Sequence, residues 1–221
     1  MSRLVVGTFV TLDGVMQAPG GPEEDRSGGF EHGGWVAPYF DEVGGRIMID
    51  WIDRADGLLL GRRTYEIFAA HWPYVSDGDP IAAKFNRVRK YVASRTLERV
   101  EWKNATLLRG DVAEAVRRLK QEPGNEVQVH GSGDLIQTLL AHDLIDEFRL
   151  WIFPVLLGTG KRLFASGTIP ARLELVETRT STTGAVLQVY RSAGRVDYGS
   201  FALEEPTAAE IERRRRVAAG K

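Results

Sequence analysis

Three segments of the sequence end an apolar, strand-like run in residues that can hold an anion. The first is LLLGRRTYE at residues 58–66, where a glycine, two arginines and a threonine follow three leucines. An arginine side chain is a planar fork that matches phosphate oxygens, and a helix N-terminus adds partial positive charge. The predicted anion-binding residues are Gly61, Arg62, Arg63 and Thr64. The alternative is a solvated helix end whose arginines pair with Glu66.

The other two segments have the same character. YVASRT ends a predicted strand in Ser94 and Arg95, and VHGSGDLI places a glycine-rich turn between a strand and a helix. Small residues let backbone amides approach a diphosphate at a helix N-terminus. Alone this turn is a weak signal, because an ordinary tight strand-to-helix turn has the same composition. Its predicted site residues are Gly131, Ser132, Gly133 and Asp134.

The elements that must position these segments alternate between strands and helices. Strands are predicted at residues 3–10, 56–61, 89–94 and 105–110 and in EVQVHGSG, with helical patterns between most of them. This alternation predicts an α/β fold, with a central mostly parallel sheet and helices on both faces. Three later strand-like segments have no helix between them, and Thr183-Gly184 has the composition of a hairpin turn. They predict an antiparallel C-terminal edge.

Parallel strands bring the three segments together. In open α/β sheets, ligands bind beyond the carboxyl ends of the strands, and all three segments are expected there. Three anion-binding features at one edge indicate a dinucleotide that carries an extra phosphate. We therefore predict NADPH, rather than NADH, as the cofactor.

Composition limits the other classes of function. The chain has 221 residues, 43% of them hydrophobic, and a net charge of −1, so we expect neither nucleic acid nor a membrane as a partner. It has no cysteine, which excludes thiol nucleophiles and Cys-ligated zinc, and its four histidines lack metal-ligand spacing, so no metal site is predicted. No apolar run approaches the roughly 20 residues of a membrane span, and the first residues lack a signal-peptide core. We expect a soluble cytoplasmic protein.

Motifs along residues 3–192 resemble the dihydrofolate reductase-like superfamily. They are TLDG (11–14), LLLGRRTYE, YVASRTL, VHGSGDLIQTLL and DEFRLWIFPVLLGTGKRLF. The last is the most specific, and it is similar to the riboflavin-biosynthesis reductase domain, the C-terminal domain of the bacterial bifunctional deaminase-reductase, and its stand-alone relatives. The resemblance implies a reductase domain over residues 1–193. Residues 194–221 are then a polar extension, expected as an exposed helix or tail, and their ERRRR run is read as solvated rather than as a nucleic-acid site.

The resemblance also implies roles for individual residues. An arginine of residues 61–64 holds the 2′-phosphate of NADPH, Ser94 and Arg95 lie on the adenine side, and residues 131–133 touch the diphosphate. The positions that line the nicotinamide are Thr8, Val15 and Met16. The resemblance further implies a homodimer and a small-molecule substrate. We expect the strand-like segment DEFRLWIFPVLLG to pair across the two-fold axis of the dimer.

Two carboxylates are candidates for proton transfer. Asp13 ends the first strand near the expected nicotinamide, although Asp-Gly is also a common turn pair. Asp41 follows an aromatic run that partly matches true dihydrofolate reductases, but it comes one residue late and also suits the first turn of the following helix. The side chains expected to enclose the substrate ring are Trp35, Tyr39 and Phe40.

The sequence leaves two functions open. The first is an NADPH-dependent reductase that transfers hydride to a pterin- or pyrimidine-like substrate of the riboflavin- or folate-pathway type. The alternative is an NADP(H)-binding module of the same fold without turnover. The anion-binding residues are required by both, so they do not distinguish them.

Overall fold

The computed structural model describes residues 1–76, 78–164 and 168–220, and its centre is a sheet of eight strands in the order β4-β3-β2-β5-β1-β6-β8-β7. The neighbours from β4 to β6 are parallel, and β8 and β7 add antiparallel pairs at the C-terminal edge. This confirms the predicted α/β architecture. The strands are β1 (Arg3–Thr11), β2 (Ala55–Gly61), β3 (Arg89–Ala93), β4 (Ala105–Leu108), β5 (Glu126–His130), β6 (Glu147–Phe153), β7 (Leu173–Thr180) and β8 (Val186–Ser192).

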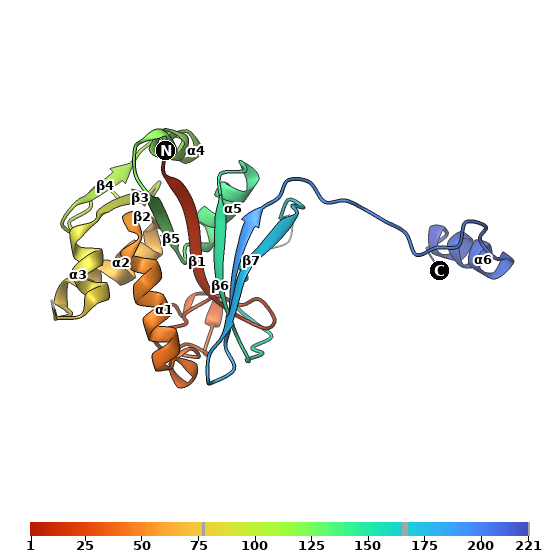
Figure 1. The fold of residues 1–221 in the computed structure, drawn as a ribbon, viewed down its shortest axis with the longest axis horizontal. Helices are drawn as coiled ribbons and strands as arrows, with labels where there is room; N and C mark the ends of the chain where they lie inside the picture. The colour runs from red at the N-terminus through yellow and green to blue at the C-terminus, as the bar shows by residue number, and fades with distance from the viewer. Residues whose placement is uncertain (77, 165–167, 221) are drawn as a thin grey trace.

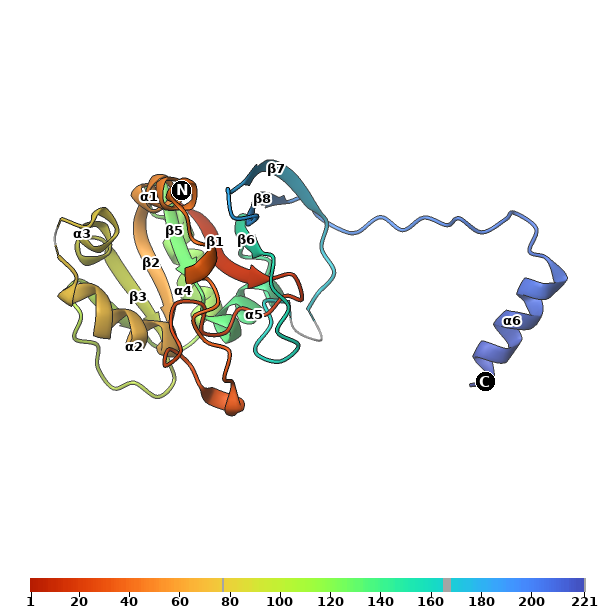
Figure 2. The ribbon, with the colours of Figure 1, turned by 90° about the horizontal axis from the view of Figure 1, so that it is seen from below.

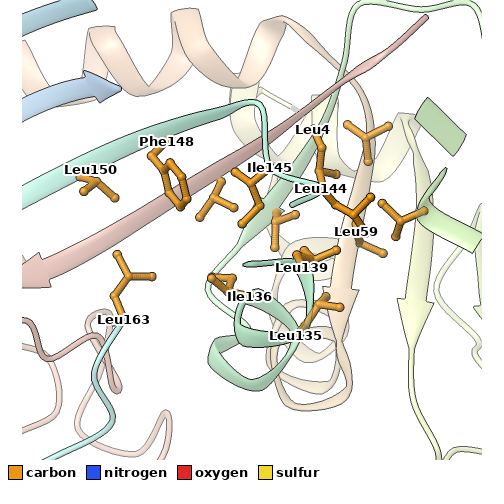
Figure 3. Packing of buried hydrophobic residues seen from close by; sticks show 14 of the residues in the cluster. Leu4, Leu59, Leu135, Ile136, Leu139, Leu144, Ile145, Phe148, Leu150 and Leu163 are labelled. Carbon is orange, nitrogen blue, oxygen red and sulfur yellow. The ribbon is translucent and has the colours of Figure 1, made fainter. Parts of the chain in front are cut away.

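Helices cover both faces of the sheet, and the alternation of side chains along the strands explains why. In β2, Leu59 packs with the cluster that includes α4 and α5, whereas Leu58 and Leu60 pack with the cluster that includes α2 and α3. Figure 3 shows the first cluster, with Leu59 beside Leu135 and Leu139 of α5. The helices are α1 (Glu42–Asp53), α2 (Arg62–His71), α3 (Pro80–Arg87), α4 (Val112–Gln121), α5 (Gly133–Ala141) and α6 (Ala208–Ala218). Three 3-10 turns lie at Ser27–Gly29, Ala37–Tyr39 and Trp72–Tyr74.

A buried ion cluster joins β5, β1 and β6 on the sheet face that α1 covers. Arg149 is 2% exposed and forms a two-pronged ion pair with Glu126, with both N–O distances 2.8 Å, and it also pairs with Glu147. Arg3 and Arg191 complete the cluster from its rim. Burial opposes the charge on Glu147, but Arg149 and its neighbours hold the pKa of that carboxyl below its usual value. The Glu147 carboxylate therefore stays charged inside the fold.

The C-terminal extension lies apart from the sheet. Figures 1 and 2 show residues after β8 running away from the body as an extended segment that ends in α6. The predicted exposed helix is present, since every residue of α6 is exposed except Glu210. Thr207 begins it by accepting a hydrogen bond from the amide of Glu210.

The segment that we expected to pair across a dimer axis lies inside the sheet. β6 is hydrogen-bonded to β1 on one side and to β8 on the other, so it offers no free edge to a second copy. The homodimer itself stays a prediction. Across the described ranges, no helix is long and apolar enough to cross a membrane.

The side chain of Lys90 is a buried hydrogen-bond donor that supports the start of β3. Its side chain is fully buried and donates hydrogen bonds to the carbonyl oxygens of Asn86, Val88 and Lys103. We expect Lys90→Met to lower the free energy of unfolding by about 2–4 kcal/mol, because three carbonyls lose their donor. Urea denaturation measures this, with the exposed Lys103→Met as the matched control. Equal stability of the two variants would contradict the role given to Lys90.

Candidate functional site

A large cavity lies at the carboxyl ends of the parallel strands, with a volume of about 1620 Å³. Besides a loop, its lining has two parts. The strand-end half consists of residues 61–64, 94–96, 109–110 and 131–134, and the aromatic half consists of Phe9, Met48, Trp51, Phe68, Phe85 and Trp151 together with Gln128 and His130. All three segments that the sequence marked as anion-binding therefore meet in one half of one cavity, together with Thr8 and Met16.

The two helices that begin in this cavity lack a side-chain cap. Asp41, Asp79, Asp111 and Thr207 cap α1, α3, α4 and α6 by accepting hydrogen bonds from first-turn amides. In contrast, α2 starts after Gly61 and α5 after Ser132 without any such bond. The first amides of a helix have no partner within it, so here they are left for water or a bound anion.

Ser132 ties these two helix starts together. Its hydroxyl accepts a hydrogen bond from the amide of Gly61 and donates to the hydroxyl of Thr64, both at 2.8 Å. The backbone of Ser132 is left-handed, with φ 68°, which costs a serine about 1–3 kcal/mol. The hydroxyl contacts offset that cost, and they hold the 131–133 turn against α2.

Three arginines of the predicted anion-binding segments line the same cavity, and two of them have a partner. Arg62 pairs with Glu66 at 3.2 Å, Arg63 donates to Ser27 and pairs with Asp25 of the preceding loop, and Arg95 makes no ion pair or hydrogen bond within the described residues. Arg62 and Arg95 are exposed and line the cavity. Both Ser94 and Arg95 lie in the lining, but the Ser94 hydroxyl accepts from the amides of Thr96 and Leu97 and so shapes its own turn.

The glycine-rich loop that follows β1 forms one wall of the cavity. Residues 16–25 line it, and Lys161 holds the loop by donating to Asp25 and to the Ser27 hydroxyl. Burial raises the pKa of Asp25, but the hydrogen bonds from Lys161 and Ser27 bring it below its usual value. The carboxylate thus stays charged and paired, which keeps the loop in place.

The aromatic half was not found from the sequence. Trp51 and Trp151 meet edge to face, with ring centroids 5.4 Å apart, and Phe9 packs on Trp151 in the same way at 5.7 Å. A signal was present: Gln128, His130 and Arg149 are polar residues at alternate positions of otherwise apolar strands. Alternate residues of a strand lie on the same face of the sheet, so this spacing indicates one face that is more polar than the other.

Comparison with known proteins supports the fold and gives the family. Residues 3–187 match the model of the RibD C-terminal domain. The chain belongs to the RibD C-terminal domain family.

Individual relatives in this comparison agree with the assignment. The uncharacterized protein YyaP of Bacillus subtilis is 31% identical over 199 residues, which cover 87% of this chain and 96% of the relative. A putative riboflavin biosynthesis protein from Shewanella sp. PV-4 superimposes with a TM-score of 0.64 at 24% identity, over 86% of this chain and 98% of that one. Dihydrofolate reductase from Enterococcus faecalis, complexed with NADP(H), gives a TM-score of 0.54 at 13% identity, over 86% of this chain and 96% of that one. The fold is therefore dihydrofolate reductase-like.

Within this family fold, Asp13 lies outside the cavity lining. Its carboxylate accepts hydrogen bonds from the Thr11 hydroxyl and from the amides of Leu157 and Gly158, and it lies 3.5 Å from Arg162. The hydrogen bond from Thr11, followed by those from the two amides, lowers the pKa of Asp13 to about 2. A carboxyl with these partners is built to fasten the 157–162 loop to β1, and it is poorly suited to donate a proton.

Asp41 also lies outside the lining, and it joins α1 to the β7–β8 hairpin. It accepts a hydrogen bond from the amide of Gly44 at 2.7 Å, and it accepts two more from the amide and hydroxyl of Thr182. The Thr182 hydroxyl and the Gly44 amide hold the pKa of Asp41 below its usual value. This corresponds to the helix-start alternative that the sequence left open.

The aromatic residues expected around the substrate ring support the cavity wall from behind. Trp35 is buried against Phe153 and donates its Nε1–H to the carbonyl of Gln17, and Tyr39 packs on the same phenylalanine. Phe40 stacks on Trp151 from outside, with ring centroids 5.9 Å apart. Val15 is fully buried under Phe30 and does not line the cavity either. Trp51 and Trp151 line the cavity, whereas Trp35, Tyr39 and Phe40 do not.

Asp13 gives a prediction about stability and pH. Because its folded-state pKa lies below the ordinary value of 3.8, ionised Asp13 stabilises the fold above about pH 4, and this contribution is lost as pH falls towards 2. We expect Asp13→Asn to lower the free energy of unfolding by about 1–2 kcal/mol near neutral pH, and to have a much smaller effect near pH 2. Denaturation measured across this range checks it.

The control for this measurement is Asp50→Asn, since Asp50 is exposed on α1 and has no ion pair or hydrogen bond in the described part of the chain. A loss of stability at Asp13 that does not change with pH would contradict the assignment.

Proposed function

We propose that the cavity binds NADPH and that the protein is a reductase of a pterin- or pyrimidine-like ring. The observation that carries the proposal is that two uncapped helix starts, of α2 and α5, share one cavity with Arg62 and Arg95. Membership of the RibD C-terminal domain family supports a reductase-type role.

The strand-end half fits the phosphates of this cofactor. The amides at the start of α5 and the 131–133 turn suit a diphosphate, which needs close approach to the backbone. Arg62 and Arg95 extend beyond the strand ends and suit a phosphate on the ribose. Arg63 bonds the loop at Ser27, whereas Arg62 pairs within its own helix, with Glu66. We therefore assign the 2′-phosphate to Arg62 and Arg95 and give Arg63 a role in closing the loop.

The aromatic half fits a flat, uncharged ring. Phe9, Trp51 and Trp151 line this half with rings that pack edge to face on one another, and Met48 and Phe68 line it too. When bound, NADPH supplies a hydride to an electron-poor carbon of such a ring. The protein orients the ring, and it excludes water through the loop that Lys161 holds.

The proton needed to complete a reduction has no obvious carboxyl donor. Among the described lining residues the carboxylates are Glu23, Glu24, Asp25 and Asp134, on the loop and at the start of α5, and none belongs to the aromatic half. We therefore propose that water in the cavity supplies the proton. This same feature favours the second candidate, a module that binds NADP(H) without turnover.

The cofactor is tested by comparing the affinities for NADP⁺ and NAD⁺. We expect Arg62→Ala and Arg95→Ala each to weaken NADP⁺ binding by about 10- to 100-fold and to leave NAD⁺ binding nearly unchanged, because each loses a charge-assisted hydrogen bond to phosphate. Isothermal titration calorimetry measures both ligands. Arg46→Ala is the matched control, since Arg46 is an exposed arginine paired with a glutamate four residues away, like Arg62, but lies outside the cavity.

If NAD⁺ and NADP⁺ bind the unaltered protein equally, or if Arg46→Ala acts like Arg62→Ala, the cofactor assignment fails.

Turnover is tested separately, by following NADPH oxidation with dihydropterins and ribosylaminopyrimidines. Tight NADPH binding with no oxidation across that panel would favour the binding module.

We also propose that the protein is a homodimer, as the family resemblance implies. The strand with a free edge within the described sheet on this side is β7, which carries the exposed Leu175 and Val176. Light scattering at low micromolar concentration should give twice the mass of one chain.

A further inference from the structure

Gln128 is held in one orientation by two acceptors. Its side-chain nitrogen donates to the carbonyl of Trp51 at 2.6 Å and to Oε1 of Glu126 at 2.5 Å. A carbonyl and an ionised carboxylate only accept hydrogen bonds, so the amide nitrogen must face them. The amide oxygen of Gln128 is therefore directed to its remaining neighbour, His130.

This orientation fixes the tautomer of His130. Its Nε2 lies 3.0 Å from Oε1 of Gln128, and because that oxygen is an acceptor, Nε2 must carry the hydrogen. Burial, with a smaller effect of Arg149, lowers the pKa of His130 to about 4, so the ring is neutral near neutral pH. The other ring nitrogen, Nδ1, is then an unprotonated acceptor.

Nδ1 of His130 is open to the cavity. In the described part of the chain no side-chain nitrogen or oxygen is both buried and without a hydrogen-bond partner, and no group there bonds to this nitrogen. His130 lines the cavity, so Nδ1 reaches its open space. Its partner on the neighbouring strand β1 is Gly7, and a Cβ there would lie 3.8 Å from Cε1 and 3.9 Å from Nδ1 of His130. A side chain at this position would therefore contact the ring edge that carries Nδ1.

We propose that His130 is a specificity-determining residue, which accepts through Nδ1 a hydrogen bond from a ring N–H or O–H of the substrate. This rests on the proposed function, and it names the substrate class as a neutral heterocycle that turns a donor edge towards β5. A cationic ring would need a carboxylate to bind it. The carboxylates beside this position, Glu126 and Glu147, are already paired with Arg149. The alternative is that His130 only packs, since its ring contacts Phe85 at 5.3 Å between centroids.

The first experiment reads the tautomer without any ligand. Proton–nitrogen NMR of the full chain with labelled histidine should show His130 as the neutral form with hydrogen on Nε2 at neutral pH. The signal is assigned by its absence in His130→Phe. A tautomer with hydrogen on Nδ1, or a charged ring, would overturn the proposal.

The second experiment uses lumazine, a flat bicyclic ring with two N–H donors, and its dimethylated analogue, in which methyl groups replace both hydrogens. Lumazine at its solubility limit, with NADP⁺ present, should shift the Nδ1 resonance, and the analogue should not. We expect lumazine to bind about tenfold more weakly to His130→Phe, and about as well to His130→Asn, whose side-chain oxygen replaces Nδ1. No shift of Nδ1, or equal affinity of the two rings, would contradict the inference.

Gly7→Ala provides a variant that keeps His130 and places a methyl group against the ring edge that carries Nδ1. It should weaken lumazine binding by about tenfold, whereas Gly45→Ala, whose Cβ also meets a neighbour at 3.9 Å but lies outside the cavity, should not. NADP⁺ affinity is measured for every variant. Intact NADP⁺ binding with no effect at His130 or Gly7 refutes this inference alone, whereas a lack of NADP⁺ binding by the unaltered protein refutes the proposed function.

Discussion

The parallel pairing of β3, β2, β5 and β1 is the constraint on which the candidate site depends. Because these strands run in one direction, the chain leaves each of them at the same edge, and segments far apart in sequence meet there. β2 and β5 are neighbours, so the starts of α2 and α5 lie close enough for Ser132 to bond both Gly61 and Thr64. Neither helix carries a side-chain cap, which leaves two sets of amides directed to one cavity.

A second constraint lies beneath the aromatic half. Burying Arg149 between Glu126 and Glu147 is tolerable only because each charged group is fully paired, and an unpaired charge there would be costly. Gly7 lies in register with both His130 and Arg149, and its lack of a side chain leaves room between them. The same carboxylate that neutralises Arg149 orients Gln128, and through it His130. The ion cluster thus also fixes the orientation of His130, a residue that lines the cavity.

Sequence alone was sufficient for the architecture and for the strand-end half of the cavity. Alternating strands and helices, with arginines and glycines at strand ends, can be recognised locally in the sequence. The common direction of parallel strands then brings the strand ends to one edge of the sheet. The aromatic half was missed because its aromatic residues come from β1, β6 and three helices, α1, α2 and α3, and only the packed fold brings them together. Asp13 and Asp41 could not be judged from type and position. What decides their roles is their partners, Thr11 and Thr182, of which Thr182 is distant in sequence.

The most direct test of this account is a crystal structure of the protein with NADP⁺. The account predicts the diphosphate over the 131–133 turn and the start of α5, with the ribose phosphate about 3 Å from the side chain of Arg62 or Arg95. It also predicts the nicotinamide between Met16 and the aromatic half, with Nδ1 of His130 left free beside it. A diphosphate bound away from the two uncapped helix starts, or a nicotinamide that covers His130, would contradict it.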